Sequence, residues 1–568
     1  MTPISGARAR RALVIALVAV VLLAPIPKMM TATATSMEEG SLLEYPTLAL
    51  HGKVPTKAYW TEYGPLNVWV PAGAYAVAGS SVVTERLVGL AYRALFLAAL
   101  YSLLRRHSKR GAVIGVVISW IILAPFGAIA YSWIGGLACL LAGLALLTAA
   151  LARERPPLLM LLGSGLALGA AISFRPDMVV GVAVGGLILL WRRWRRLPAV
   201  LGGVAVGLLP LAALVALAGM SNVWNNLVVD PLIHLRAGRH LPVPPPTNEV
   251  AEFFTRIEAW TSTASRWPGP APAVQLASLF WVLIGAALLL GISLWIGRRR
   301  SDARSWAALV AVSLLLFPQL VQRCDLNHMR FVGCLWLAMA PVAVAIVAGA
   351  TERQSDRIMD VSAIAVLVTL MLAAPFFQVQ AFVNLLPGFG PPIGPAGAAV
   401  HSKGRTLPAQ SERQAREISA ALAQLDAVSR PGERFFQGPA DLSKTNYSET
   451  WMYWLEPDLV PSTYYLEMNP GISNARGSGL AAQVDSADVA LLSTRYAAFS
   501  EPNSSVTPGN PAPNVVVERH FCLVARSGFS SILRHLAAGR SVDPARLDPS
   551  QRRRVGTHPE ALCSALRR

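Results

Sequence analysis

Charged side chains are scarce in this chain. Only 14% of its 568 residues are Asp, Glu, Lys or Arg, while 54% are hydrophobic and the mean hydropathy is +0.46. Soluble domains usually carry about 25% charged residues. This shortage excludes an ordinary soluble globular protein, and it predicts that most of the chain lies in a lipid bilayer.

Cysteine and lysine are scarce as well. The five cysteines are scattered and form no CxxC pair, so neither a cysteine metal site nor a disulfide framework is indicated. The only plausible bridge would join Cys522 to Cys563. Six lysines stand against 44 arginines, a balance typical of a GC-rich bacterial genome.

Common catalytic signatures are also missing. The sequence has no phosphate-binding P-loop, no GxSxG elbow and no HExxH, so an ATP-driven pump or a serine hydrolase is unsupported. The net charge of +18 would suit a nucleic-acid partner. However, the arginines cluster in short runs between hydrophobic segments, as the positive-inside rule of membrane proteins predicts, so we expect no nucleic-acid partner.

Eleven hydrophobic segments predict an α-helical polytopic membrane protein. The first, 12–27, is short for a span of roughly 20 residues. A cleavable signal peptide is the alternative, because TATATS follows, but we expect an uncleaved helix. The other ten segments are 82–104, 111–125, 133–151, 158–174, 178–191, 197–218, 274–296, 307–320, 331–350 and 358–382.

The loops between these segments predict the orientation. With the N-terminus in the cytoplasm, every inner loop is rich in arginine: RRHSKR, ARER, RRWRR, GRRRSDAR and TERQSDR. The outer loops, which include FRPD, QRCDLNH and a polar loop at 221–270, are mixed or acidic. We therefore expect a multi-pass protein of the bacterial plasma membrane whose C-terminal part is extracytoplasmic.

The C-terminal part differs in composition. After the Pro/Gly linker PGFGPPIGPAG, the stretch HSKGRTLPAQSERQAREISAALAQLDAV carries an amphipathic helix in its second half. The strand candidates ERFFQG, DVALLS, NVVVERHFCLVAR and FSSIL follow. We thus predict a transmembrane domain at 1–382, with a functional first outer loop at 28–81, and an extracytoplasmic α/β domain at 383–568.

The first outer loop carries four acidic residues near the bilayer, namely Glu38, Glu39, Glu44 and Glu62. Its half-apolar runs 40–50 and 64–77 could lie flat on the membrane as interfacial helices, with a turn between them. Carboxylates are costly to place near lipid without a use. One interpretation is a loop that presents carboxylates to a substrate at the membrane surface; the alternative is a solvated loop with ordinary surface charge.

Further charged residues collect at the outer ends of the segments. A carboxylate there could act as a general base, and an arginine could hold a phosphate. Each residue alone could equally be a polar cap of a transmembrane helix, but their gathering on one side favours function. These residues are Glu85, Arg86, Arg175, Asp177, Asp230, Arg236, Arg239, Arg323, Asp325 and His328.

Two of the charged groups need separate comment. Arg93 follows Arg86 by seven residues inside the second segment, where it could touch a lipid phosphate or pair with Asp177. His328 follows Asp325 at i, i+3 spacing, but two groups are too few for a metal site. His51, His234 and His240 lie in outer loops at spacings that predict no metal site.

The order of these motifs resembles that of the GT-C glycosyltransferases, and within them bacterial enzymes of the protein mannosyltransferase and aminoarabinose transferase group. Their first outer loop reads as an acidic DE-G, then G-x-x-P-Y-x-D-F, then Y-G-P-L, then a small-residue helix. Here the matching stretches are 38–40, 52–60, 63–66 and 77–79, with FRPD and the run from Gln322 to His328 further on. The resemblance covers about residues 10–350.

The resemblance implies transfer of a sugar from a polyprenyl-phosphate-linked donor to a glycan, lipid or protein acceptor outside the cytoplasm. Glu38 falls where the family has an aspartate and would be the general base, supported by Glu39 or Glu62, while Ala58 stands where a second acid often occurs. The donor phosphate would be held by Arg93, Arg175 and Arg323, with Asp177, Asp325 and His328 in support. No cofactor is firmly implied, although some members use a divalent metal.

Two other classes remain open at this stage. A transporter or flippase of lipid-linked sugars would need the same cavity but no base, and transporters often contain internal repeats, which the two halves of this sequence do not show. A scaffolding envelope protein would act through its C-terminal domain. The aromatic stretch FQGPADLSKTNYSETWMYWLEP could stack on sugars or could form that domain's core.

Overall fold

The computed structural model describes residues 6–247, 270–389, 398–445, 447–497 and 501–536. Their contacts divide the chain into two units. The helical unit comprises 1–32, 86–211 and 241–393, and the mixed unit comprises 33–85, 212–240 and 394–568. The contacts therefore group the first outer loop with the C-terminal residues, whereas the sequence placed it with the helices around it in the chain.

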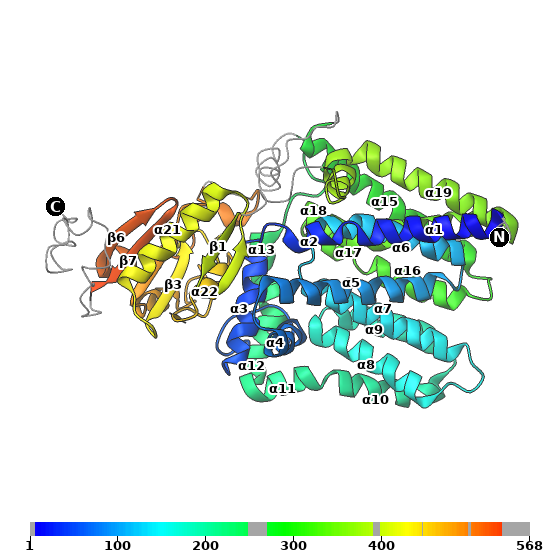
Figure 1. The fold of residues 1–568 in the computed structure, drawn as a ribbon. Coiled ribbons are helices and arrows are strands. Elements are labelled where there is room, and N and C mark those ends of the chain that lie inside the picture. The colour runs from blue at the N-terminus through cyan, green and yellow to red at the C-terminus, as the bar shows by residue number, and fades with distance from the viewer. Residues whose placement is uncertain (1–5, 248–269, 390–397, 446, 498–500, 537–568) are drawn as a thin grey trace. The chain divides into compact units, whose positions relative to one another are not determined.

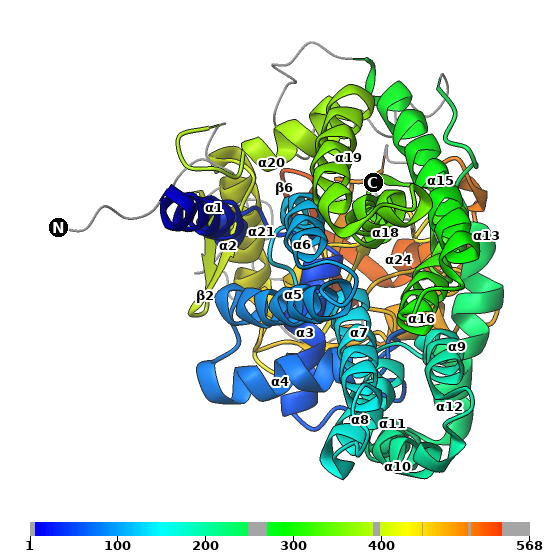
Figure 2. The same cartoon turned by 90° about the vertical axis from the view of Figure 1, so that its right-hand side faces the viewer.

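The helical unit is built from long helices that run side by side (Figure 1), and Figure 2 looks almost along the axes of several of them. In chain order the long and short helices of this unit are α1 (Gly6–Leu23), α2 (Ile26–Thr31), α5 (Val82–Leu104), α6 (Lys109–Leu123), α7 (Ser132–Leu151), α8 (Leu158–Phe174), α9 (Met178–Leu190), α10 (Leu197–Gly207), α15 (Pro272–Gly297), α16 (Ala303–Leu314), α17 (Phe317–Gln322), α18 (Leu326–Val347), α19 (Glu352–Ala373) and α20 (Ala381–Val383). Helix α11 (Leu209–Ala218) begins in this unit, and its larger part belongs to the mixed unit.

By length and composition, seven helices among the described residues could each cross a membrane, and two bent pairs raise the number to nine. Two shorter apolar helices, α8 and α9, account for the remaining predicted segments. The prediction of a polytopic helical protein is thus confirmed. The bends lie at 42° between α10 and α11 and at 111° after α19. A proline follows each break, Pro210 and Pro375, and proline cannot donate the helical hydrogen bond.

The arginine-rich loops meet at one end of the helical unit. His107 Nδ1 lies 2.6 Å from the Asp302 carboxylate, and Arg110 pairs with Asp360. Arg193 donates to the Leu151 carbonyl. The first contact joins two of the loops that the sequence predicts on the same side of the membrane, and the other two join a loop arginine to the adjoining turn of a neighbouring helix, α19 or α7. These contacts agree with the predicted grouping of the arginine-rich loops, and both the alternation of the loops and the assignment of this end to the cytoplasm stay predictions.

Helix α5 approaches the α6–α7 connection closely at Gly89. A Cβ atom placed on Gly89 would lie 1.8 Å from the Ala128 carbonyl oxygen, which is backbone and cannot rotate away. We expect Gly89→Ala to cost about 1–3 kcal/mol of stability, since overpacking forces the backbone to shift. Thermal unfolding in detergent would measure the loss.

The matched control for this prediction is Gly186→Ala on α9, where an added Cβ meets no atom within 4 Å. That change should leave the melting temperature equal or raise it slightly, because alanine has a higher helix propensity than glycine. Equal melting temperatures for the two variants would contradict the prediction.

The mixed unit contains a β1–β2 hairpin and a five-stranded sheet with the strand order β4-β3-β5-β7-β6 (Figure 1). Strands β3, β4 and β5 are parallel, while β7 pairs antiparallel with both β5 and β6. The bounds are β1 (Ala399–Ser402), β2 (Arg405–Pro408), β3 (Arg434–Pro439), β4 (Val460–Pro461), β5 (Val489–Ser493), β6 (Phe521–Ser527) and β7 (Ser530–His535).

Both faces of the sheet are covered. Alternate strand residues such as Phe435, Val489 and Ile532 share a core with the amphipathic helix α21 (Glu412–Val428). Their neighbours face a second core that includes residues of α23 (Leu480–Asp485) and lies beside α24 (Ala512–His520). This burial on both faces explains why β5 reads as a continuous apolar run.

Most of the secondary structure predicted for the C-terminal part is confirmed: α21 as an amphipathic helix, and β3, β5 and β7 as strands. The prediction for NVVVERHFCLVAR is wrong in its first half, which forms α24 before the chain enters β6. The side chain of Asn510 accepts a hydrogen bond from Ala512 N (3.1 Å) just before this helix, so this turn and the packing of the helix override the strand preference of the three valines.

Two helices from the first outer loop, α3 (Glu38–Leu50) and α4 (Leu66–Ala78), complete this unit with α22 (Trp451–Leu455), α12 (Met220–Trp224), the π-helical segment 225–234 and α13 (Leu235–Arg239). Both predicted helices of the loop exist. However, α3 is buried from Glu39 to Thr47, so it is a core helix rather than an interfacial one. The described part of the predicted polar loop 221–270 is helical as far as Arg239.

Candidate functional site

The acidic pair of the first loop opens helix α3. Glu39 is fully buried. Its backbone N–H donates to Thr35 Oγ1 (3.0 Å), and its carboxylate accepts from Thr35 N (3.2 Å). This reciprocal pair closes the first turn, as a capping box does. Glu38 is the first residue of the helix and is half-buried. A carboxylate at a helix N-terminus is stabilised by the helix dipole, which suits an ionised base.

One face of α3 leads from Glu38 to a carboxylate that the sequence did not single out. Glu38, Ser41 and Tyr45 are spaced at i, i+3 and i+7 and therefore share a face of the helix. Glu467, which is buried, interacts electrostatically with the side chains of Ser41 and Tyr45, so it lies near this face of the helix. Glu467 thus lies about one helical turn along from Glu38.

A network links Glu467 to the predicted residue Glu62. Arg239 Nη1 donates to Glu62 Oε1 (2.6 Å), and its Nη2 donates to the side-chain oxygen of Asn469. The Asn469 amide donates to Glu467 Oε2 (3.0 Å). Three distant segments of the chain therefore meet here, and Arg239 contacts Glu62 directly and is linked to Glu467 through Asn469.

Further contacts hold these segments together. Trp60 Nε1 donates to Asp230 Oδ2 (2.8 Å), whose other oxygen lies 2.8 Å from His234 Nδ1. The Tyr464 hydroxyl donates to the Thr56 carbonyl (2.8 Å). The first loop is thus fixed to both the 212–240 segment and the C-terminal residues, which positions Glu62 and Arg239.

Burial raises the pKa of two carboxyl groups in this unit. The pKa of Glu467 is raised to about 7 by burial and by the charge of Glu62, against the opposing hydrogen bond of Ser41 and the charge of Arg239. The pKa of Glu44, also on α3, is raised to about 8 by burial, against the charge of Arg405. Both groups can therefore exchange a proton near neutral pH.

The backbone beside Glu467 is strained. Met468 has a φ of +54°, in the left-handed region that side chains other than glycine seldom adopt. It lies between the two network residues Glu467 and Asn469. Strain of this kind persists where the surrounding structure holds the backbone in place, and it is common at functional sites.

The arginine of this network is the subject of a stability prediction. The side chain of Arg239 is 23% exposed and that of Glu62 is 9% exposed. Removing one partner of a fully buried pair costs about 3–5 kcal/mol, so for this partly exposed pair we expect Arg239→Met to cost about 2 kcal/mol. Thermal unfolding should show the loss, and adding Glu62→Gln should recover part of it.

Arg416→Met serves as the control for this experiment. Arg416 pairs with Glu412 at 3.2 Å on the surface of α21, where both side chains are more than 70% exposed. Surface pairs contribute about 0–1 kcal/mol, so this variant should melt close to wild type. A loss for Arg239→Met no larger than for Arg416→Met would contradict the proposed network.

The helical unit holds two predicted phosphate-binding arginines in matching Arg-x-Asp pairs. Arg175, which directly follows α8, donates from Nε (3.0 Å) and Nη2 (2.6 Å) to the two carboxylate oxygens of Asp177. Gln319 on α17 donates to the same carboxylate (3.2 Å). Arg323 follows Gln319 by one helical turn, so both pairs lie at the same end of this unit.

The second pair also caps a helix. Asp325 accepts from His328 N (2.9 Å) as the N-cap of α18 and from Arg323 Nε (2.7 Å), and its carboxylate lies 2.9 Å from His328 Nδ1. The structure thus brings Arg323, Asp325 and His328 together as the sequence spacing suggested. Their contacts include a capping function, which was the alternative interpretation.

The arginines of α5 bind backbone carbonyl groups. Arg93 is fully buried and donates from Nη1 to the carbonyls of Gly89 (2.9 Å) and Ile129 (2.8 Å). Arg86, also buried, donates to the Met30 carbonyl (2.8 Å). The bonds of Arg93 to Gly89 and Ile129 fix the α6–α7 connection against α5, and the Asp177 carboxylate accepts from Arg175 and Gln319.

The structure also decides the question of the aromatic stretch. Trp451, Tyr453 and Trp454 are buried in the same core as α3 and α21. They therefore act as core residues, as the alternative interpretation held.

No protein-family model and no curated protein matches the chain. The chain is similar to the crystal structure of ArnT from Cupriavidus metallidurans bound to undecaprenyl phosphate, with 15% identity, a TM-score of 0.45, and coverage of 93% of this chain and 98% of that one. For the apo state of ArnT the values are 14%, 0.44, 93% and 99%. ArnT is an aminoarabinose transferase of the GT-C type.

Proposed function

We propose that this protein transfers a sugar from a polyprenyl-phosphate-linked donor to a glycan, lipid or protein acceptor of the cell envelope, on the extracytoplasmic side of the plasma membrane. The proposal rests on one observation: the mixed unit brings three carboxylates and an arginine together. Glu467 lies near the α3 face that begins at Glu38, and it is linked to Glu62 through Asn469 and Arg239. Buried carboxylates with a raised pKa beside a half-buried carboxylate are typical of general acid–base sites.

In the proposed reaction, the oxygen of an acceptor hydroxyl group attacks the anomeric carbon of the sugar, and a carboxylate of the protein takes the proton of that hydroxyl group. The bond between this carbon and the phosphate oxygen breaks, and its electron pair leaves with the polyprenyl phosphate. Glu38 is the proposed base because it is half-buried and lies at a helix N-terminus. Glu467 is the second candidate, and Glu39 supports Glu38 by closing the helix turn.

The leaving phosphate gains negative charge, which arginine stabilises with fixed donors. We assign this function to Arg175 and Arg323, because both lie at the same end of the helical unit and are oriented by an aspartate. The two carboxylates, Asp177 and Asp325, hold the guanidinium groups in place. Arg93 contributes by positioning the α6–α7 connection.

The test measures release of polyprenyl phosphate by the purified protein in nanodiscs, using radiolabelled polyprenyl-phosphate sugars and an envelope extract as acceptor. Release by wild type, with loss in Glu38→Gln, supports the transferase and its base. A transporter would instead move the intact donor across the bilayer of proteoliposomes without releasing polyprenyl phosphate. Movement without release by wild type would overturn the proposal.

A further inference from the structure

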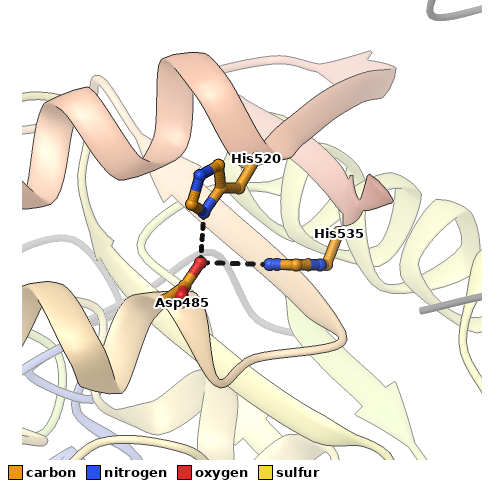
Figure 3. Close-up of side chains that lie close together, drawn as sticks. All are labelled: Asp485, His520 and His535. Atoms are coloured by element: carbon orange, nitrogen blue, oxygen red, sulfur yellow. Dashed lines mark hydrogen bonds and ion pairs between the residues drawn. The ribbon is translucent and has the colours of Figure 1, made fainter. Parts of the chain in front are cut away.

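A group of two histidines and one aspartate lies at the surface of the mixed unit, apart from the residues assigned to sugar transfer (Figure 3). Asp485 ends α23, His520 ends α24 and His535 ends β7. The ligand atoms of the three side chains all lie within 4.8 Å of one another. Figure 3 shows both imidazole rings directed at the Asp485 carboxylate.

The contacts of this group already resemble those of a ligand set. His520 Nδ1 pairs with Asp485 Oδ1, and His535 Nε2 lies 3.2 Å from the same oxygen. Two ligands of a tetrahedral zinc ion lie about 3.4 Å apart, since each ligand atom is about 2.1 Å from the metal. A cation could thus enter after small side-chain rotations, with no change in the backbone.

The chemistry of the donors selects the class of metal. Imidazole nitrogen suits zinc and the other late first-row divalent ions, whereas magnesium and calcium prefer all-oxygen sites. Two nitrogens and one carboxylate oxygen leave at least one coordination position for water or for an exogenous ligand. The accessibility of the group, with Asp485 and His520 nearly half exposed, allows a hydrated ion to enter.

We propose that Asp485, His520 and His535 form a binding site for a divalent transition metal, with zinc as the first choice. The ligands come from the ends of two helices and a strand. A bound ion would therefore join α23 and α24 to the sheet and stabilise the folded domain, because a ligand that binds only the folded state shifts unfolding to higher temperature.

The test uses the full chain in detergent, purified without a polyhistidine tag, treated with EDTA and then dialysed against zinc sulfate. Bound zinc is measured by elemental analysis and stability by thermal unfolding. The variants are His520→Gln, His535→Gln and Asp485→Asn, and His401→Gln is the control because His401 is an exposed histidine on β1 of the same unit.

Wild type and His401→Gln should bind one more zinc ion than the three site variants, or bind it at least tenfold more tightly. Zinc should raise the melting temperature of the first two proteins only, and magnesium should raise neither. Asp485→Asn keeps the shape of the side chain, so it tests the site even if a histidine variant folds poorly. Equal zinc uptake by all five proteins would overturn the proposal.

Discussion

Replacing Glu38 with glutamine is expected to lower the rate of polyprenyl phosphate release by at least about 100-fold, the usual contribution of a positioned general base. Glutamine keeps the size and shape of the side chain but cannot accept the proton of the acceptor hydroxyl group. Because Glu38 is the first residue of α3 and only half-buried, the change should leave the fold and donor binding intact. The release assay in nanodiscs measures the rate, and binding of the labelled donor is measured in parallel.

The matched control is Glu412→Gln. Glu412 is also the first residue of a helix in the mixed unit, but its side chain is 74% exposed and pairs with Arg416. This variant should release polyprenyl phosphate at the wild-type rate. If Glu38→Gln also does so, Glu38 is not the base, and Glu467→Gln becomes the decisive variant, because the pKa of Glu467 is raised to about 7.

Glu39→Gln separates catalysis from structure within the acidic pair. Glu39 is buried and bonded to Thr35 at the helix start. Glutamine keeps an oxygen that can accept from Thr35 N, and the backbone bond to Thr35 is unchanged, so the replacement should lower stability by less than about 1 kcal/mol and change the rate less than Glu38→Gln, as thermal unfolding and the release assay would measure.

The helices were largely predictable from the sequence, because each long apolar run must satisfy its backbone internally in lipid. The bounds of α5 and α8 agree with the predicted segments 82–104 and 158–174 to the residue. The bends after α10 and α19 were not predicted, although Pro210 and Pro375 were visible as signals for them. Sequence order also gave no sign that 33–85 and 212–240 pack with the C-terminal residues.

The candidate site was predictable only in part. Glu38 and Glu62 stand out as acids near lipid, and Arg239 was one of many outward charges. Glu467 was missed because its importance depends on the proximity of α3, which lies more than 400 residues away in the chain. Its hydrogen bond with the nearby Asn469 has no sequence signal of its own. The signal available was a single acid inside the apolar aromatic run TYYLEMNPG, where a charge needs a partner.

A second large effect is expected in the pH dependence of stability, through Glu44. This residue is 4% exposed on α3, and its pKa is raised from the usual 4.5 to about 8, mainly by burial. Below pH 4.5 the group is protonated in both the folded and the unfolded chain and costs nothing. As the pH rises from 4.5 to 8, the unfolded chain loses this proton first, so the folded state becomes less stable.

The full shift corresponds to at most about 5 kcal/mol, reached at and above pH 8. Glu467 acts in the same direction, with its loss complete near pH 7. Glu44→Gln removes the proton-dependent penalty, so the variant should melt close to wild type at pH 5 and clearly higher than wild type at pH 8. Thermal unfolding of the full chain in detergent between pH 5 and 8 measures this difference.

Glu412→Gln again provides the control, because an exposed carboxyl group should give the same difference from wild type at every pH. Parallel curves for Glu44→Gln and wild type would show that Glu44 ionises in the folded protein as easily as in the unfolded one. If the curves diverge as expected, the protein keeps a destabilising carboxyl group inside α3 that a neutral side chain would improve. A protein that keeps such a residue gives up stability at this position. The proposed proton transfer beside α3 is a functional reason for keeping a carboxyl group there.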